Sequence, residues 1–509
     1  MEKRRFDVEK NYIDCMNEID AEELFKGLLA HGMFAEKLPP IFTSASFYDY
    51  CCDYGNTLGK KAHDYVYYET MRNTNVPRQL GIPAPMSYYH MCKTLSENWE
   101  RICNHFYKNT HNDRHKISRI HIRKLKGKPT LFEMGYDNWQ TDGTPEIDLL
   151  LGKRFAVHAD ISTCFPSIYS HALAWALVGK SKAKNEQNIS KAWQNKIDAA
   201  CQIVRNNETH GLIIGPHASN LIAEIILTAI DHKLSQSGWE YVRRIDDYSC
   251  YTETMEEAES FLRELTDELR VYDLSINHKK TRVVELPVAL TKEWKRQLNA
   301  FALVAPYGGT SYKEASSYLD LAVKLMEEHN MDAAVLNYAI KTLSGQRLSH
   351  NAKEYCAKQA MHLAIIYPYL TPLMDEFVFQ AYSVKKRSIH EFSKILINKA
   401  DLTGNYEMAC YAVFYSIKYG FKISKDLLKK VEEKTTNSIL LLLLWLYYKR
   451  NDMMEAKERI TKKADCLLNN QEFERNWIFV YEVVAEDKLE NEWKVIKGRG
   501  VSFIKDEYK

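Results

Sequence analysis

The sequence predicts an α+β core followed by an all-α, solenoid-like helical-repeat domain. Strand-like runs at 154–160, 241–251 and 282–286 alternate with segments whose apolar residues follow helical periodicity. After Pro287, glycine is sparse and apolar residues recur at helical spacing in one segment after another. We therefore expect three parts, which are an N-terminal helical part at 1–110, a mixed core at 111–290 and a helical-repeat domain at 291–509.

Composition narrows the class of protein. The 509 residues carry 69 basic and 67 acidic side chains, so affinity for nucleic acid would have to come from local patches rather than from a global field. Eleven cysteines occur without a CxxC pair, which predicts reduced, mostly buried thiols and no structural zinc. The charged N-terminus does not resemble a signal peptide, and the apolar run 439–448 is too short to span a bilayer. We expect a cytoplasmic protein that does not enter a membrane.

The first element of the core, residues 114–128, is predicted to form a basic β-hairpin. It contains seven Lys or Arg and no acid, and isoleucine alternates with basic residues from Ile120 to Arg123. Lys126-Gly127-Lys128 then supplies turn chemistry. The alternative is a charged edge strand whose lysines prevent aggregation.

Carboxylates lie at the ends of the next predicted strands. Asp160 ends the strand-like run 154–160, while Asp246 and Asp247 interrupt strand-forming residues where a hairpin turn would fall. Such a pair is also common at a solvated turn. Hard divalent cations prefer carboxylate oxygens, so convergence of Asp160 with Asp246 would hold two Mg²⁺ (or Mn²⁺) ions roughly 3.5–4 Å apart, as in nucleotidyl transfer.

Between these carboxylates lies a turn-rich segment, 211–220, that leads into a predicted helix at 221–234. Ser219 or Asn220 is suited to cap that helix, and the glycines permit close approach of the backbone to a ligand. A capping box at 254–257 opens the next helix. Residues 274–281 then lead into the last strand.

These blocks resemble the reverse transcriptases over about residues 110 to 290. Asp160 with Phe165 is similar to that family's motif A, 211–220 to motif B, Asp246-Asp247 to motif C, and Asn277-x-x-Lys280-Thr281 to motif D. The resemblance implies a right-hand core of palm and fingers that makes DNA from dNTPs. One position departs from the family pattern, because Arg244 stands where an aromatic residue is usual. An arginine there would contact a backbone phosphate or shield the carboxylates.

The resemblance also assigns roles to the carboxylate site. Asp160, Asp246 and the backbone carbonyl of Ile161 would bind the metal ions, and Asp247 would support the site electrostatically. Phe165 would be the steric gate that excludes a ribose 2′-hydroxyl, with a core aromatic as the alternative.

Further residues are expected to bind the incoming nucleotide. Gly215 and Pro216 belong to the motif B loop beside it. Lys280 would neutralise or protonate the pyrophosphate, although it could also be a solvated lysine, with Lys279 adjoining it. In the fingers of reverse transcriptases a hairpin cradles the triphosphate, which makes four residues of the basic segment candidates: Arg123, Lys124, Lys126 and Lys128.

The region after Pro287 is predicted to contain roughly ten helices between Ser311 and Glu486. One apolar stripe runs through 356, 360, 363 and 367 and is stopped by Pro368, and another runs through 336, 339, 340 and 343. No strict repeat consensus is visible.

This layout, together with residues 24–40, resembles the abortive-infection reverse transcriptases of bacterial antiphage defence, particularly prophage-encoded members. The resemblance implies template-independent, tyrosine-primed synthesis, single-stranded DNA that stays attached to protein, and a homo-oligomer. The sequence does not identify the priming tyrosine. Two alternatives remain open, which are an RNA-templated DNA polymerase and a non-catalytic scaffold or sensor.

Overall fold

The N-terminal part is mainly helical and carries one β-hairpin. The computed structural model describes residues 10–72, 76–134, 142–187, 190–287, 292–303, 309–469 and 472–509. The hairpin pairs β1 (Val66–Met71) with β2 (Pro77–Ile82) in antiparallel register. The helices of this part are α1 (Tyr12–Asn17), α2 (Ala21–Leu29), α3 (Ala45–Tyr54), α4 (Pro85–Glu97) and α5 (Trp99–Thr110).

A four-stranded antiparallel sheet forms the centre of the core, in the order β4-β5-β3-β6. Its strands are β3 (Phe155–Asp160), β4 (Tyr241–Arg244), β5 (Asp247–Thr252) and β6 (Arg282–Glu285), as the sequence predicts. Around the sheet lie α7 (Pro145–Leu149), α8 (Cys164–Ser167), α9 (Ala172–Val178), α10 (Lys180–Asn185), α11 (Trp193–Ile203), α12 (His217–Gln236) and α13 (Met255–Val271). The fold is therefore α+β in this half.

The two faces of the sheet are different. Val157, Ala159, Tyr248 and Cys250 alternate onto the face that joins the main hydrophobic core. The opposite face carries a small separate cluster of Leu149, Ala156, Val242 and Tyr251. By the same alternation, Asp160 and Asp247 belong to this second face, where the apolar cover is limited.

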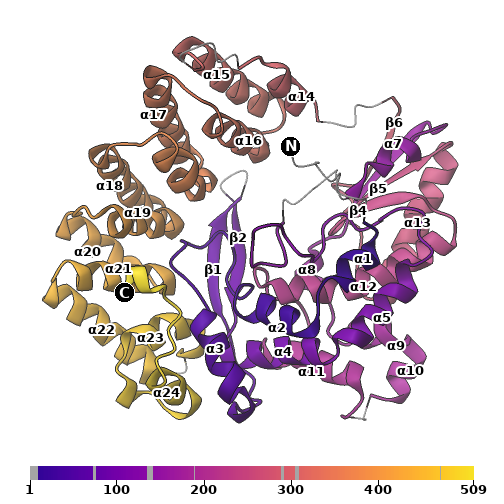
Figure 1. Ribbon diagram of the computed structural model, residues 1–509, viewed down its shortest axis with the longest axis horizontal. Helices are drawn as coiled ribbons and strands as arrows, with labels where there is room; N and C mark the ends of the chain where they lie inside the picture. Colours follow the sequence, from indigo (N-terminus) through magenta and orange to yellow (C-terminus); the bar gives the residue numbers. More distant parts are fainter. Residues whose placement is uncertain are drawn as a thin grey trace, which may run out of the picture.

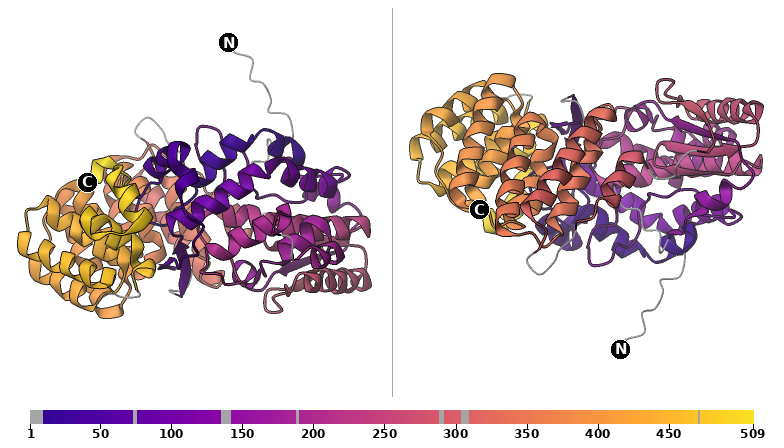
Figure 2. Two further views of the ribbon diagram at one scale, coloured as in Figure 1. Left: turned by 90° about the horizontal axis from the view of Figure 1, so that it is seen from below. Right: turned by 90° about the horizontal axis from the view of Figure 1, so that it is seen from above.

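The helical region forms an arc of consecutively packed helices (Figures 1 and 2). Its helices are α14 (Glu293–Ala300), α15 (Tyr312–Glu328), α16 (Ala333–Ser344), α17 (His350–Ile366), α18 (Lys386–Thr403), α19 (Tyr406–Tyr419), α20 (Lys425–Lys434), α21 (Ser438–Arg450), α22 (Met454–Asn469), α23 (Trp477–Val483) and α24 (Asn491–Gly498). The predicted stripe through 336, 339, 340 and 343 is buried, and the other is buried except at Tyr367, which is half-buried. Helix α17 ends before Pro368. Packing between sequence neighbours is the arrangement expected of a solenoid.

The arc closes on the N-terminal part, and the β1–β2 hairpin lies inside it (Figure 1). The Thr43 N–H donates to the Phe503 carbonyl at 3.0 Å, and the Trp477 indole N–H donates to the Ile82 carbonyl at 3.3 Å. One hydrophobic core continues through all three parts. The limits at 110/111 and 290/291 therefore remain a prediction.

The cysteines and the apolar run 439–448 are as the sequence predicts. All eleven cysteines are free and most are buried. The apolar run 439–448 forms a buried helix, α21. No helix in the described part of the chain combines the length and the hydropathy needed to cross a bilayer.

Two local predictions are wrong. Helix α12 begins at His217 with Pro216 as its N-cap residue, so Ser219 and Asn220 lie in its first turn. The fixed φ of Pro216 sets the start of the helix four residues earlier than the polar caps suggested. The basic segment 114–128 contains no regular strand. It forms only a turn closed by the Lys128 N–H on the Leu125 carbonyl at 3.2 Å, with one cross-turn bond from the Arg123 N–H to the Leu131 carbonyl at 2.8 Å.

Candidate active site

Strand register brings the three aspartates together at one end of the sheet. Asp160, the last residue of β3, is directly opposite Asp247, the first residue of β5. Asp246 precedes it in the two-residue turn between β4 and β5, and its carbonyl accepts the Ile161 N–H at 3.0 Å. In extended backbone the N–H and carbonyl of one residue point to the same side, so the Ile161 carbonyl also faces the Asp246 turn. The convergence predicted for Asp160 and Asp246 is present.

The turn that carries Asp246 is held by a buried arginine, Arg243. Its guanidinium is 0% exposed and binds Asp231 at 2.6 Å and Glu224 at 3.1 Å, both on α12. It also donates to the Ile245 carbonyl at 2.9 Å. Ile245 has φ 57°, which is strained for a β-branched residue, and the bond to Arg243 fixes the carbonyl beside this strained position. The network therefore fixes the backbone from which Asp246 projects.

This network was missed by sequence reasoning. Glu224 and Asp231 are seven residues apart in the largely apolar, buried middle of α12, so they share one face of the helix. Two acids on a buried helical face require a buried cation. Two acids spaced seven residues apart in a buried helix were the sequence signal from which a buried cation could have been predicted.

Electrostatics confirm that the carboxylates crowd one another. Burial raises the pKa of Asp246, and the Asp160 charge raises it further. Burial, the Asp246 charge and a hydrogen bond with Asp160 raise the pKa of Asp247 to about 6. The carboxylates therefore repel one another, and a cation among them would relieve that repulsion.

Two residues of the segment before β6 contact Asp160. The Lys280 ammonium lies 2.5 Å from Asp160 Oδ2, and the Asn277 amide donates to Oδ1 at 2.9 Å. The Asn277 N–H also donates to the Asp160 carbonyl at 2.7 Å. Lys280, which is predicted to act on the pyrophosphate, thus forms an ion pair with Asp160. Its charge also lowers the pKa of Asp246.

The donor set fits a hard divalent cation in part. Asp160, Asp246 and the Ile161 carbonyl are oxygen donors on one edge of the sheet, as Mg²⁺ requires. Among the described residues, no three His, Cys, Asp or Glu side chains come close enough together to hold an ion by themselves. This agrees with the usual Mg²⁺ site, where one or two carboxylates are completed by substrate phosphates and water.

The predicted gate and the motif B loop lie next to each other. The Leu212 N–H donates to the Phe165 carbonyl at 2.8 Å, and the Gly81 N–H of β2 donates to the Ile214 carbonyl at 2.9 Å. Gly215 has φ 129° and lies against Ala35. The Phe165 side chain is 7% exposed and belongs to the main core, as the core-aromatic alternative requires. Its role as a gate stays a prediction.

The basic segment does not present one cationic surface. Arg123 is buried and binds Asp142 at 2.7 Å, together with Lys116. The buried acid Asp142 draws these two side chains inward, so they do not form an exposed cationic strand.

The three lysine candidates of this segment stay on the surface. Lys124 pairs with Glu23 at 2.6 Å, Lys128 pairs with Glu133 at 2.7 Å, and Lys126 is exposed. Arg123 is thus removed as a ligand for the triphosphate by its burial, while the three lysines remain predictions.

A different hairpin brings a cation near the carboxylates. Arg78 of β2 is close enough to Asp246 that its charge lowers the pKa of that carboxyl. Burial lowers the pKa of Arg78, and Arg72 lowers it further, whereas Asp246 opposes both effects. Sequence reasoning missed Arg78 because the contact joins residues far apart in the chain. Arg244, at the unusual position, pairs with Glu146 at 2.7 Å.

Comparison with known proteins supports one family. Residues 97–313 match the model of the family described as reverse transcriptase (RNA-dependent DNA polymerase). No curated protein sequence matches the chain. Among solved structures, apo telomerase from Candida tropicalis is 12% identical, with 82% of this chain and 75% of that chain covered and a TM-score of 0.32. Telomerase from Candida albicans in complex with the TWJ fragment of telomeric RNA is 11% identical, with 81% and 67% covered and a TM-score of 0.28.

Proposed function

We propose that this chain, which carries a reverse-transcriptase domain at residues 97–313, is a nucleotidyltransferase that makes DNA at the site of Asp160, Asp246 and Asp247. The observation that carries this proposal is the register of the sheet. It sets Asp160 opposite Asp247 and places Asp246 in the adjoining turn.

Each residue has a defined task in this proposal. Mg²⁺ or Mn²⁺ held by Asp160, Asp246 and the Ile161 carbonyl would activate the attacking hydroxyl and offset phosphate charge. Asp247 contributes negative charge beside the pair, and Lys280 is positioned to exchange Asp160 for a phosphate of the nucleotide. Arg78 adds a second cation on the hairpin side.

We further propose that synthesis is template-independent and protein-primed, that single-stranded DNA stays attached through a tyrosine, and that the protein acts as a homo-oligomer in abortive-infection phage defence. The support is the resemblance of residues 24–40 and of the overall layout to that group. Within this segment, the Gly32 carbonyl accepts the His217 N–H at 2.8 Å, so the segment packs directly on the motif B loop.

A template-free incorporation assay tests the proposal. Purified protein, Mg²⁺ and labelled dNTPs are incubated without template or primer, and the products are resolved on a denaturing gel before and after protease treatment. Label that migrates with protein, is released by protease and disappears in Asp246→Ala supports it. Asp267→Ala, at an exposed ion pair on α13, is the matched control and should retain activity.

RNA-templated DNA synthesis is the second candidate, and the description of the matching family favours it. Silence without template, followed by extension once an RNA template and DNA primer are supplied, would establish it instead. A scaffold without catalysis would keep its biological effect in Asp246→Ala, whereas an enzyme would lose it.

A further inference from the structure

Two cavities lie on either side of the short helix α9 and share Trp175. Their volumes are about 740 and 630 Å³, within the range of ligand-binding cavities. The three catalytic aspartates line neither of them. The Trp175 ring is half-buried, and Lys180 lies over it with Nζ 4.0 Å from the ring centroid.

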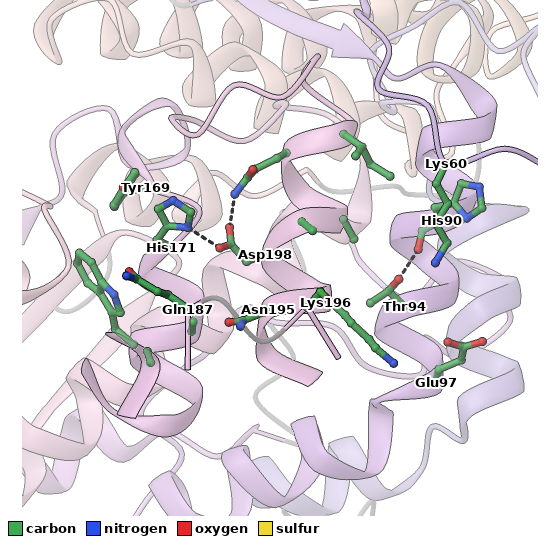
Figure 3. A pocket seen from close by; sticks show the side chains of 18 of the residues that line it. Lys60, His90, Thr94, Glu97, Tyr169, His171, Gln187, Asn195, Lys196 and Asp198 are labelled. Carbon is green, nitrogen blue, oxygen red and sulfur yellow. Dashed lines mark hydrogen bonds and ion pairs between the residues drawn. The ribbon is translucent and has the colours of Figure 1, made fainter. Parts of the chain in front are cut away.

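The first cavity combines aromatic rings with lysines. Figure 3 shows Tyr169 and His171 on one side of it and Lys60 on the other. Tyr169 packs edge-on against Trp175, with centroids 5.7 Å apart. His171 is held through Nδ1 by Asp198, which leaves the Nε2 edge of its ring for a ligand. The cavity thus offers flat apolar surfaces beside donors.

The second cavity has the same chemistry without acidic residues. Arg101 and Lys108 of α5 line it, together with Lys233 of α12. Trp193 and Tyr272 are its further aromatic residues, and the Arg101 guanidinium lies 5.7 Å from the Trp193 ring centroid. Rings and cations therefore continue from one cavity into the other through Trp175.

The lysines and arginines that line the two cavities form no ion pair with any described carboxylate. In the described part of the chain, none of six side chains forms an ion pair: Lys60, Lys184, Lys196, Arg101, Lys108 and Lys233. The two acids of the first cavity are engaged, since Asp198 binds His171 and Glu97 lies 3.9 Å from Lys93. In a chain with a net charge of only +2, this concentration of unpaired cations creates a local positive potential that favours an anionic ligand.

We propose that the two cavities form a binding track for single-stranded DNA, separate from the active site. Cations that follow the phosphates, interleaved with rings that stack on bases, are the features that bind single strands without sequence preference. A duplex offers no free base faces to Trp175 or Tyr169. DNA is the strand that a polymerase of this family makes, so the choice of DNA rests on the proposed function.

The track also contacts the segments that frame the nucleotide site. The Ser170 N–H donates to the Thr209 carbonyl at 2.7 Å, and the Gly211 N–H donates to the Ile168 carbonyl at 2.7 Å. Tyr169 stacks on His210 at 4.7 Å. Segment 165–170, which carries Phe165, is thus hydrogen-bonded to segment 209–212. A strand bound at Tyr169 would contact this pair of segments on the side opposite Phe165.

Binding is tested without catalysis. The probe is a fluorescein-labelled oligo(dT) of about 20 nucleotides, which is longer than the roughly 4–16 nucleotides that such sites cover. Its fluorescence anisotropy is measured with the Asp246→Ala protein in EDTA, over a series of NaCl concentrations. We expect Trp175→Ala to weaken binding by about tenfold, and Trp175→Phe to retain it. Lys60→Glu with Lys196→Glu should reduce the salt slope by about 1.4, at about 0.7 per lost phosphate contact.

The control is an equal charge reversal on α15, Lys313→Glu with Lys324→Glu, which should leave affinity and slope unchanged. Equal losses in the control, or tight binding of duplex DNA by the same residues, would overturn the track. Tighter binding of oligo(U) than of oligo(dT) would overturn the choice of DNA. The proposed function is tested separately, by nucleotide incorporation with the unsubstituted protein. If that assay shows no incorporation, the binding result for the track still stands.

Discussion

Replacing Arg243 by methionine should destabilise the protein far more than the same change at Arg244. Arg243→Met leaves Glu224 and Asp231 charged and unpaired in the interior, a loss of about 3–5 kcal/mol. Unfolding entropy of about 2.1 cal/mol/K per residue amounts to about 1.1 kcal/mol/K for 509 residues, so the melting temperature should fall by about 3–5 °C. Arg244 is 38% exposed, and loss of its pair with Glu146 should cost at most about 1 kcal/mol.

Thermal unfolding by differential scanning fluorimetry and nucleotide incorporation are measured on both variants. Incorporation should fall in Arg243→Met even below its melting temperature, because the Ile245 carbonyl loses its donor and the Asp246 turn is released. Adding Glu224→Gln and Asp231→Asn should restore part of the stability by removing the uncompensated charges. Equal shifts for Arg243→Met and Arg244→Met would refute the reasoning.

Four other changes probe the site. Asp247→Asn should raise the melting temperature at neutral pH, because the raised pKa of about 6 means that the charged form of Asp247 opposes folding. Thermal scans across pH should show this gain vanish below the pKa that Asp247 has in the unfolded chain. Arg78→Ala should move the acidic limb of the pH–rate profile to higher pH, since Arg78 lowers the pKa of the neighbouring aspartate. Gly211→Ala should unfold readily, because φ is 87° and a Cβ would lie 2.9 Å from a carbonyl oxygen, whereas Gly404→Ala, at φ 71° with open space, should cost only about 1 kcal/mol; thermal scans compare the two. Phe165→Ala should increase ribonucleotide incorporation relative to deoxynucleotide if the ring is a gate, and should lower stability alone if it is only a core residue, as separate kcat/KM measurements would show.

The features of this site that the sequence predicts correctly are those that depend on local residue pattern. The strands ending at Asp160 and flanking Asp246 follow from residue propensity, and the register of β4 with β5 follows from the short turn between them. The pairing of β3 with β5 joins distant segments, so it does not follow from that turn. The same reasoning failed for 114–128, where alternation of isoleucine and basic residues mimics a strand. The buried Asp142, which turns Arg123 inward, leaves no trace in that stretch.

The approach of Arg78 to Asp246 shows why the distant half of the chain matters to the chemistry. Arg78 lies on a hairpin whose two strands are each tied to the helical region. The Met71 N–H donates to Glu407 at 2.7 Å, and Trp477 donates to the Ile82 carbonyl. Two-stranded hairpins are marginally stable alone, so the position of this cation depends on α19 and α23. The helical region therefore helps to hold the hairpin that carries Arg78, and a disturbance of its packing on β1 and β2 would reach the carboxylates through Arg78.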